Sequence, residues 1–426
     1  MNISDKNIQA IPKGNVDSTI VFLMFGGAFL ALIHQLMRTS IPNEIRWLTY
    51  LFFGLGFGLF LVGAYCVEQN RVPKLLNTIL QVSSKFLLIS KNQLVSLFFA
   101  IALSITGVIA GGGEAYLYNP YISLFSWAGS IFLIVIAGWE RKPLPFRPWN
   151  RALLWAIGFF LIALSLRAIN TTIYPSALSG DEASSGVYSV SFINNLTNNI
   201  LNVGWFSFPS LYFFIQSIGI RILGQNIPGL RITAAVVGSL TVLTFYLIMR
   251  AMFDNRTAFI ASILLAFSHY HINFSRIGLN NIWDGLGFVV TLGALCFAWN
   301  HERKAAFILA GLALGLSQYF YTSARGLLVV VPIWLIFVIF QDKERFKRLV
   351  PSLILMVITA FIAILPLAWF FVQHPDEFQA PMTRVSILGD WLIQNSINTG
   401  EPVWKLILNQ LTTSLLAFTE KPLRAW

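Results

Sequence analysis

Charged residues and cysteines are scarce in this sequence, and each scarcity excludes a class of protein. Only 11% of the 426 residues are Asp, Glu, Lys or Arg, against about a quarter in a typical soluble domain, so the chain cannot cover itself with a water-facing surface. The two cysteines, Cys66 and Cys296, lie in separate apolar runs and match neither a disulfide framework nor a metal-binding spacing. The sequence also shows no internal repeat, which counts against a transporter built from inverted repeats.

Apolar residues, by contrast, are abundant. Hydrophobic residues make up 56% of the chain, and the mean hydropathy is +0.69. These values predict an integral membrane protein. In a membrane protein, the net charge of +11 is explained by basic residues that set the membrane topology. We therefore expect no nucleic-acid partner.

Apolar runs of about 20 residues, long enough to cross the hydrocarbon core, recur along the chain. The first run is followed by no small-residue cleavage site and is predicted to be a retained helix rather than a signal peptide. The fold class is therefore all-α, a polytopic transmembrane protein of about eleven spans. The predicted spans are 18–37, 47–67, 94–113, 121–138, 152–169, 232–250, 257–274, 282–299, 304–321, 326–340 and 349–372.

One further apolar segment, 207–223, decides the orientation of every later loop. It is interrupted by Gln216 and Arg221 and is only just long enough to cross a membrane. If it crosses, the basic clusters 303–304 and 343–348 lie on the opposite side from earlier basic loops, against the positive-inside rule. We therefore predict an amphipathic helix on the outer membrane surface.

This topology divides the chain into three predicted parts. A four-helix transmembrane extension covers 1–151, and a core covers 152–388, with a long outer loop at 170–230 that holds the amphipathic helix. An extracytoplasmic tail covers 389–426 and contains another amphipathic stretch at 403–418.

The long outer loop contains two adjacent carboxylates, Asp181 and Glu182, just before helical sequence. Such groups are costly at a membrane edge unless they are solvated, paired or used. They either offset the free amides at a helix start or supply a general base whose pKa is raised by low-dielectric surroundings. Neighbouring residues do not share a helix face, so the two cannot flank a glycosidic bond as opposed carboxylates.

A second cluster, His269-Tyr270-His271, precedes Arg276 at the predicted outer end of the seventh span. The fork-shaped guanidinium of Arg276 suits a phosphate, and the alternative is an interfacial role for this side chain. His269 and His271 point in different directions on a helix, so we do not expect a metal pair.

A third cluster lies at the same predicted boundary, where Tyr319 and Tyr321 precede Arg325. Tyrosines at this depth are commonly aromatic-belt residues, whereas hydroxyl groups beside a guanidinium could also bind a phosphate or a sugar. A fourth group opens the tail with His374 and is followed by Arg384. Any functional site is therefore expected to face outward.

In this order the clusters resemble those of a family, the polyprenyl-phosphate-sugar-dependent membrane glycosyltransferases of the GT-C fold. That family includes protein O-mannosyltransferases and the aminoarabinose transferase of lipid A. The resemblance extends over about 152–388 and rests on Gly180-Asp181-Glu182, Leu230-Arg231, Gly238, Tyr246, Arg250, Phe274-Ser275-Arg276, Gly315-Leu316-Ser317, Tyr319, Tyr321 and Arg325.

The resemblance implies inverting transfer of a sugar from an undecaprenyl or dolichyl monophosphate to a hydroxyl of a lipid, glycan or protein acceptor. The reaction is expected at the extracytoplasmic face of a bacterial inner membrane. A guanidinium already in position neutralises the leaving phosphate without a metal. Binding of a divalent cation by the carboxylates is an alternative that stays open. The implied roles are Asp181 as base with Glu182 in support, Arg276 and Arg325 at the phosphate, Tyr319 and Tyr321 at the donor, and His271, His374 and Arg384 as further substrate-binding candidates.

Some positions depart from the mannosyltransferase pattern. Phe208-Pro209-Ser210 stands where His-Pro-Pro is common, and Asn281 stands where an Asp is common, with Asp284 nearby. The chain stops at Trp426, before the last helices that many relatives carry, so it is either a short member or a fragment.

Two rival functions stay open. One is a ligase or polymerase of lipid-linked glycans that uses a pyrophosphate donor. The other is a transporter or flippase, but the main ionisable residues within the predicted spans, Arg167 and Asp284, lie near outer ends. That distribution favours chemistry at the surface over transport.

Overall fold

The computed structural model describes most of the chain, and nearly all of the described residues are helical. The described residues are 8–10, 17–37, 47–69, 71–111, 120–140, 149–197, 200–385 and 390–416. Two short strands among them, β1 (Ile8–Ala10) and β2 (Arg71–Pro73), pair in antiparallel orientation. The chain forms two compact units, Met1–His374 and Pro375–Trp426. The prediction of an all-α polytopic membrane protein is confirmed.

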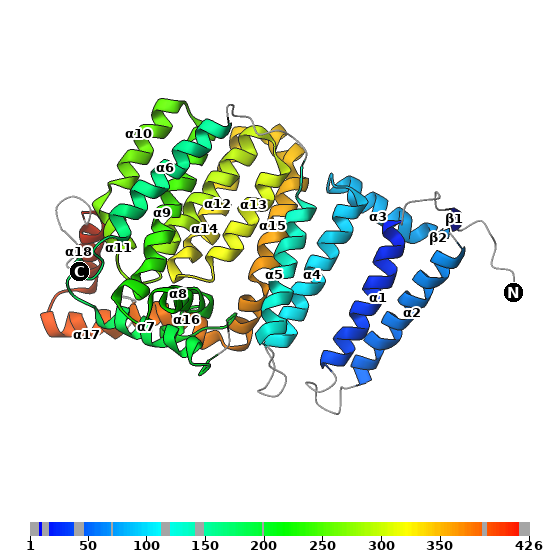
Figure 1. Cartoon of the computed structure of the whole chain (residues 1–426), viewed down its shortest axis with the longest axis horizontal. Helices are drawn as coiled ribbons and strands as arrows, with labels where there is room; N and C mark the ends of the chain where they lie inside the picture. The colour runs from blue at the N-terminus through cyan, green and yellow to red at the C-terminus, as the bar shows by residue number, and fades with distance from the viewer. Residues whose placement is uncertain are drawn as a thin grey trace. The chain divides into compact units, whose positions relative to one another are not determined.

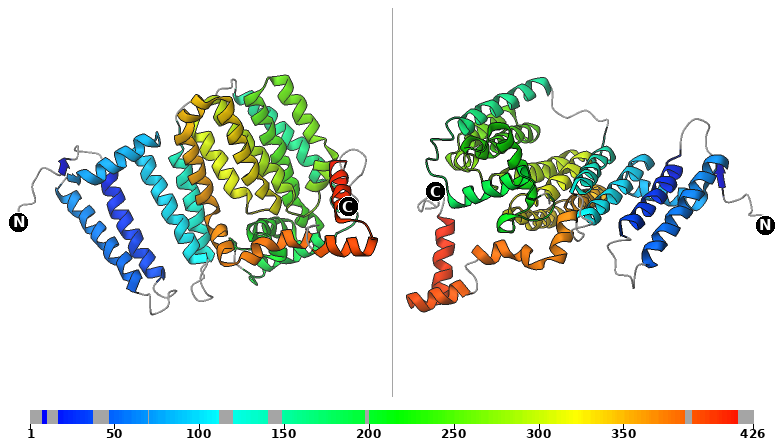
Figure 2. Two further views of the ribbon diagram at one scale, coloured as in Figure 1. Left: turned by 180° about the vertical axis from the view of Figure 1, so that it is seen from behind. Right: turned by 60° about the horizontal axis from the view of Figure 1, so that its bottom comes forward.

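Ten of the eleven predicted spans each correspond to one helix of the first unit, and the span 257–274 corresponds to two. Six of the described helices are long and apolar enough to cross a membrane, and the others are shorter apolar helices. Figures 1 and 2 show the helices of the central bundle running side by side. The helices that correspond to predicted spans are α1 (Ser18–Met37), α2 (Trp47–Gln69), α4 (Lys91–Gly111), α5 (Pro120–Ala137), α6 (Trp149–Ala168), α9 (Ile227–Met252), α10 (Asn255–Ala266), α12 (Ile282–His301), α13 (Lys304–Ser317), α14 (Leu327–Gln341) and α15 (Lys343–Gln373).

The structure corrects two predicted spans. The span 257–274 is broken, because α10 ends at Ala266 and a separate short helix, α11 (His269–Ser275), follows it. The carbonyl of Ala266 accepts a hydrogen bond from the Arg167 side chain at 3.1 Å instead of continuing the helix. The span 304–321 is too long, since α13 ends at Ser317 and a 3-10 turn, η4 (Thr322–Gly326), precedes α14. An amphipathic helix, α3 (Lys74–Phe86), was not predicted.

The long loop after α6 contains α7 (Gly180–Ile193), the turn η3 (Trp205–Ser207) and α8 (Ser210–Leu223). At a rise of 1.5 Å per residue the 14 residues of α8 extend about 21 Å, less than the roughly 30 Å of a hydrocarbon core. In Figure 1, α7 lies across one end of the bundle and α8 is seen end-on, whereas the long helices run lengthwise. This arrangement agrees with the predicted surface position of α8.

The core of the bundle packs α12, α13, α14 and α15 around buried side chains such as Leu295, Phe307 and Leu327. Close approach of α13 and α15 depends on glycine. A β-carbon at Gly311 would lie 2.2 Å from the carbonyl oxygen of Met356, so only a residue without a side chain allows this helix spacing.

Two helices of the predicted N-terminal extension also pack on the core. The indole of Trp127 in α5 donates to the Ala363 carbonyl of α15 at 2.8 Å, and the Ser104 hydroxyl of α4 donates to Ile362 at 2.8 Å. Buried hydrogen bonds of this kind hold the helices at a defined register. The predicted boundaries at 151 and 388 are left as predictions.

The second unit contains α16 (Pro375–Val385), α17 (Asp390–Thr399) and α18 (Val403–Leu415). The helix α18 covers most of the predicted amphipathic stretch, whose last two residues lie outside the described ones. Its exposed apolar residues Trp404, Leu408, Leu411 and Leu415 are spaced four, three and four apart, which places them on one face. Such a stripe suits a helix that lies on a membrane surface.

Candidate functional site

The candidate site lies at the end of the bundle that carries α7 and α8 (Figure 1). Ser179 begins α7, and its side chain accepts a hydrogen bond from the Glu182 backbone N–H at 3.1 Å. Asp181 and Glu182 both lie in the first turn of this helix. Asp181 is exposed, whereas Glu182 is buried, so the two adjacent carboxylates have opposite surroundings.

Glu182 forms a buried ion pair with Arg231 of α9, and both side chains are only 1% exposed. Arg231 Nε donates to Glu182 Oε1 at 2.6 Å, and its Nη2 donates to Oε2 at 2.8 Å. The backbone N–H of Gly278 donates to Oε1 at 2.8 Å. Because both oxygens are engaged and shielded, Glu182 holds α7 in place, and its predicted role in support of Asp181 stays a prediction.

Arg231 also orders the loop before α7. Its two terminal nitrogens donate to the carbonyls of Thr171 at 2.6 Å, Pro175 at 2.9 Å and Ala177 at 3.1 Å. With the two bonds to Glu182, all five N–H groups of this guanidinium have acceptors. The loop is thereby held although it has no regular structure.

Arg276 binds backbone carbonyls rather than facing open space. Its nitrogens donate to Leu166 at 2.7 Å, Ile169 at 2.8 Å, Asn170 at 3.1 Å and Tyr174 at 3.1 Å. These carbonyls lie at and beyond the C-terminal end of α6, where a positive charge is favourable. The geometry therefore gives Arg276 a role in closing α6, not the predicted contact with a phosphate.

A second group of polar side chains gathers around Tyr321. Burial raises the pKa of Tyr321, the negative charges of Asp284 and Asp181 raise it further, and a hydrogen bond with Asn281 lowers it. Asp284 accepts a hydrogen bond from the Ser323 hydroxyl. We call Asp181, Asn281, Asp284, Tyr321 and Ser323 the carboxylate-tyrosine cluster, which combines residues of α7, α12 and the α13–α14 connection.

One oxygen of the cluster lacks a partner. Oδ1 of Asp284 is buried and accepts no hydrogen bond from any described residue. An unsatisfied buried acceptor costs about 1–3 kcal/mol, so a donor from a bound molecule would be favourable here. The described residues include no group of three or more His, Cys, Asp and Glu side chains that could hold a metal ion.

Arg325 and Tyr319 occupy different surroundings although both belong to the third sequence cluster. Arg325 lies in η4, two residues after Ser323, partly exposed and with its guanidinium carbon 5.5 Å from the centre of the Phe371 ring. Tyr319 is fully buried, packs its ring 5.1 Å from Trp127, and accepts the Leu367 N–H at 3.3 Å. Tyr319 is thus a core residue, and its predicted place in a donor site is not supported.

His271 contacts a buried arginine. Arg167, which is fully buried, donates to His271 Nδ1 at 3.0 Å and to the Ser275 hydroxyl at 3.2 Å. The second ring nitrogen of His271 is buried without a partner among the described residues. These contacts join α6 to α11 close to the loop that holds α7.

The remaining two predicted residues lie apart from the cluster in the chain. His374 ends α15 and is exposed, with its ring 4.5 Å from that of Phe370. Arg384 belongs to α16 of the second unit. Their substrate-binding roles stay predictions.

Sequence reasoning gave no role to Arg231 and left Arg167 and Asp284 outside the predicted site. An available signal was the presence of ionisable residues at the ends of apolar helices, which are costly there and commonly have a specific partner or function. Adjacency along the chain could not reveal that the charges of Asp181 and Asp284 both act on Tyr321, because the two carboxylates are about 100 residues apart.

Comparison with known proteins finds similarity to membrane glycosyltransferases over the part of the chain that holds most of the cluster. Residues 207–370 match the family described as dolichyl-phosphate-mannose-protein mannosyltransferase. This range covers α8 to α15 and includes Asn281, Asp284, Tyr321 and Arg325, whereas Asp181 precedes it. No solved structure matches the chain.

Individual relatives match about two fifths of the chain. An undecaprenyl phosphate-alpha-4-amino-4-deoxy-L-arabinose arabinosyl transferase of Pseudomonas fluorescens (strain Pf0-1) is 26% identical over 194 residues, 43% of this chain and 34% of the relative. One from Pseudomonas aeruginosa (strain UCBPP-PA14) is 27% identical over 191 residues, 42% of this chain and 33% of the relative.

An archaeal protein matches as well. Dolichyl-phosphooligosaccharide-protein glycotransferase 3 of Archaeoglobus fulgidus is 28% identical over 181 residues, which are 37% of this chain and 20% of the relative. The chain spans about a third of the length of the arabinosyl transferases that it matches. These matches confirm the resemblance predicted from the ordered motifs: the core of this protein is similar to membrane glycosyltransferases of the GT-C type.

Proposed function

We propose that this protein is an inverting glycosyltransferase that moves a sugar from a polyprenyl monophosphate to a hydroxyl group of a lipid, glycan or protein. One observation carries the proposal. The buried Glu182–Arg231 pair holds α7, and the exposed Asp181 of this helix is close enough to Tyr321 for its negative charge to raise the pKa of that tyrosine. A rigid carboxylate beside polar side chains is what a general base requires.

In the proposed reaction Asp181 accepts the proton of the acceptor hydroxyl. The hydroxyl oxygen then forms a bond to the anomeric carbon, and the bond from that carbon to the phosphate oxygen breaks on the opposite face. The lipid phosphate leaves with the electron pair. Glu182 acts as a positioning residue, because both of its oxygens are already bound.

Arg325 is the residue we assign to the donor phosphate. It is partly exposed and follows Tyr321 and Ser323 in the same turn. A guanidinium placed before the reaction stabilises the negative charge that develops on the leaving phosphate. Arg276 already donates four of its five N–H groups to backbone carbonyls, so we do not assign it to the phosphate.

Asp284 is assigned to the sugar. Its Oδ1 atom is buried without a donor, and sugar hydroxyl groups are donors of the required kind. Ser323 holds the other oxygen. A hydrogen bond from the sugar would thus satisfy this buried acceptor and orient the ring for attack.

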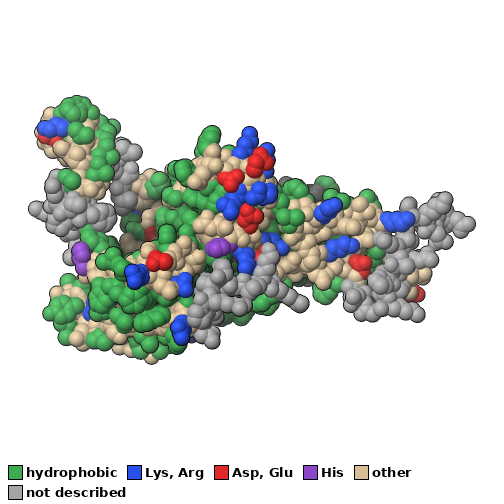
Figure 3. All heavy atoms as spheres, turned by 90° about the horizontal axis from the view of Figure 1, so that it is seen from above, with side chains coloured by type: hydrophobic (Ala, Val, Ile, Leu, Met, Phe, Trp, Pro, Cys, Tyr) green, Lys and Arg blue, Asp and Glu red, His purple; other side chains and the backbone are tan. Residues whose placement is uncertain are grey.

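The site is assigned to the extracytoplasmic face of a bacterial inner membrane. Figure 3, seen from the other end, shows Lys and Arg side chains at several places, with acidic side chains among those near the middle of the view. That end carries the first turns of α6, α10, α13 and α15 and the last turn of α9. The positive-inside rule supports a cytoplasmic position for it, so the cluster would face the opposite side.

The proposal is tested by release of free polyprenyl phosphate in proteoliposomes supplied with a panel of polyprenyl-phosphate sugars and native membrane extract. Asp181→Asn should lower the rate by a factor of about 10²–10⁴, as loss of a general base does. Asp342→Asn is the matched control, because Asp342 caps α15 at the other end of the bundle and Asn also caps helices. The control should keep its activity.

Each contrary result is informative. Full transfer by Asp181→Asn would overturn the base assignment. Release from pyrophosphate-linked donors alone would replace the proposal by a glycan ligase or polymerase. Movement of intact donor lipid across the bilayer without cleavage would replace it by a flippase.

A further inference from the structure

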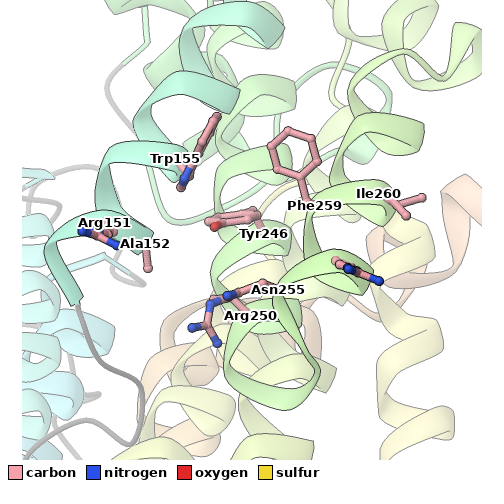
Figure 4. Close-up of a pocket in the computed structure, with 9 residues that line it drawn as sticks. Arg151, Ala152, Trp155, Tyr246, Arg250, Asn255, Phe259 and Ile260 are labelled. Carbon is pink, nitrogen blue, oxygen red and sulfur yellow. The ribbon is translucent and has the colours of Figure 1, made fainter.

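A pocket opens at the end of the bundle away from the candidate site, between α6, α9 and α10 (Figure 4). The two sites are separated by the length of α9, whose 26 residues extend about 39 Å. The cavity volume is about 480 Å³, within the range of roughly 300–1,000 Å³ that is typical of small-molecule sites. It is therefore large enough for a headgroup-sized ligand.

Three arginines from three helices line this pocket. Arg151 lies in the first turn of α6, Arg250 in the last turn of α9 and Arg256 in the first turn of α10. Within the described part of the chain, no carboxylate forms a salt bridge with any of them. Three guanidinium groups without counter-ions favour an anion.

The nearest acidic residue along the chain is Asp254, and its carboxylate is used by a helix. It caps α10, accepting the Thr257 N–H at 3.2 Å and the Arg256 N–H at 3.3 Å. Hydrogen bonds with Thr257 lower the pKa of Asp254, and the bond to the Thr257 side chain has a larger effect than the bond to its backbone. The Arg256 N–H lowers the pKa further. One capping carboxylate against three arginines leaves the pocket positively charged.

The walls of the pocket are apolar and face outward. Trp155 is 54% exposed and Ile260 58% exposed, and they belong to the apolar helices α6 and α10. The rings of Trp155 and Phe259 pack edge to face at 5.3 Å. In Figure 4, Tyr246 lies between Trp155 and Arg250, and this tyrosine is buried. The pocket is thus cationic at one end and apolar on the side where acyl chains would lie.

We propose that this pocket binds the headgroup of an anionic membrane phospholipid in the leaflet opposite to the candidate site. The arginines pair with the phosphate, whose oxygens suit fork-shaped donors. The aromatic and aliphatic walls contact the glycerol and the first part of the acyl chains, as basic pockets between transmembrane helices do. A soluble anion would leave the apolar walls without a function. This binding does not depend on the proposed transfer reaction.

The test is a titration of the whole purified chain in non-ionic detergent with short-chain phosphatidylglycerol. Phosphatidylcholine of the same chain length and inorganic phosphate are the comparison ligands. We expect phosphatidylglycerol to bind and to raise the melting temperature. In Arg250→Gln/Arg256→Gln its dissociation constant should rise about 30-fold, from the usual contribution of each basic residue at an anionic membrane.

The matched control is Lys343→Gln/Lys347→Gln, which removes two basic residues from α15 at the same end of the bundle. It should bind the lipid as the unaltered chain does. If the arginine double variant without lipid has a lower melting temperature than the unaltered chain, the single variant Arg256→Gln replaces it in the test, because Arg256 is exposed. Its affinity for the lipid should fall about 5-fold.

Three results would overturn the proposal. Equal weakening in the lysine control would mean that general surface charge attracts the lipid. Equally tight binding of phosphatidylcholine would exclude recognition of the negative headgroup. Inorganic phosphate that binds as tightly as the lipid would indicate a site for a soluble anion.

Discussion

Asp181 and Glu182 are neighbours with the same chemistry, yet the structure gives them separate tasks. Glu182 is enclosed with Arg231, while Asp181 is exposed near Tyr321. The distinction follows from the start of α7 at Gly180, since adjacent side chains on a helix point about 100° apart. Loss of stability and loss of activity should therefore separate cleanly between the two positions.

Glu182→Gln is expected to destabilise the protein by about 3–5 kcal/mol, because it leaves the charge of Arg231 buried without a counter-ion. The measurement is an unfolding titration in detergent micelles. Glu344→Gln serves as the control, since Glu344 is 74% exposed in its pair with Lys347 and surface pairs contribute at most about 1 kcal/mol. Equal stability of Glu182→Gln and the unaltered chain would refute the structural role of the buried pair.

At the residue scale the sequence singled out several residues of the carboxylate-tyrosine cluster but not the surroundings of each one. Asp181 and Glu182 were singled out because they are adjacent carboxylates. Tyr321 and Arg325 were singled out because they belong to the ordered motifs of the family resemblance. The separation of partly exposed Arg325 from buried Tyr319 depends on where α13 ends, which hydropathy does not resolve. The contact between Glu182 and Arg231 is a tertiary fact that hydropathy and motif spacing do not contain.

Helices were predictable from apolar runs because a membrane admits few other structures. Their ends were less predictable. The helix α9 begins at Ile227 rather than at the predicted 232, since Asn226 caps it by accepting the Gly229 N–H at 2.9 Å and Arg231 lies inside it. The missed α3 has too many polar residues for a hydropathy window, although its apolar residues share one face.

Glycine substitutions test the packing of these elements. Gly311→Ala should destabilise the bundle by about 1–3 kcal/mol, because the new methyl group meets the Met356 carbonyl at 2.2 Å and the two helices must separate. Gly158→Ala in α6 meets no atom within 4 Å, so the better helix propensity of alanine should stabilise by up to about 1 kcal/mol. Melting temperatures that shift in the same direction would contradict this account of α13 and α15.

For the whole molecule, the two ends of the bundle differ in charge, and this difference predicts sidedness. We expect Leu196→Cys, near the end of α7, to react with a membrane-impermeant maleimide added outside intact cells. Lys343→Cys, at the start of α15, should react only after the membrane is opened. The labelling is done after Cys66 and Cys296 are replaced by Ala. Reaction of Lys343→Cys in intact cells would reverse the topology and, with it, the assigned face of the site.

The buried Glu182–Arg231 pair has a consequence for how this sequence can change over evolutionary time. Either residue altered alone leaves the other as an enclosed charge, whereas replacement of both by apolar residues of similar volume can preserve stability. The two positions, 49 residues apart, are therefore expected to vary together among related chains. If evolution removed one of the two charged residues before the other, the intermediate protein would fold poorly. The Glu182–Arg231 pair should therefore persist even in related chains that differ in sugar or acceptor.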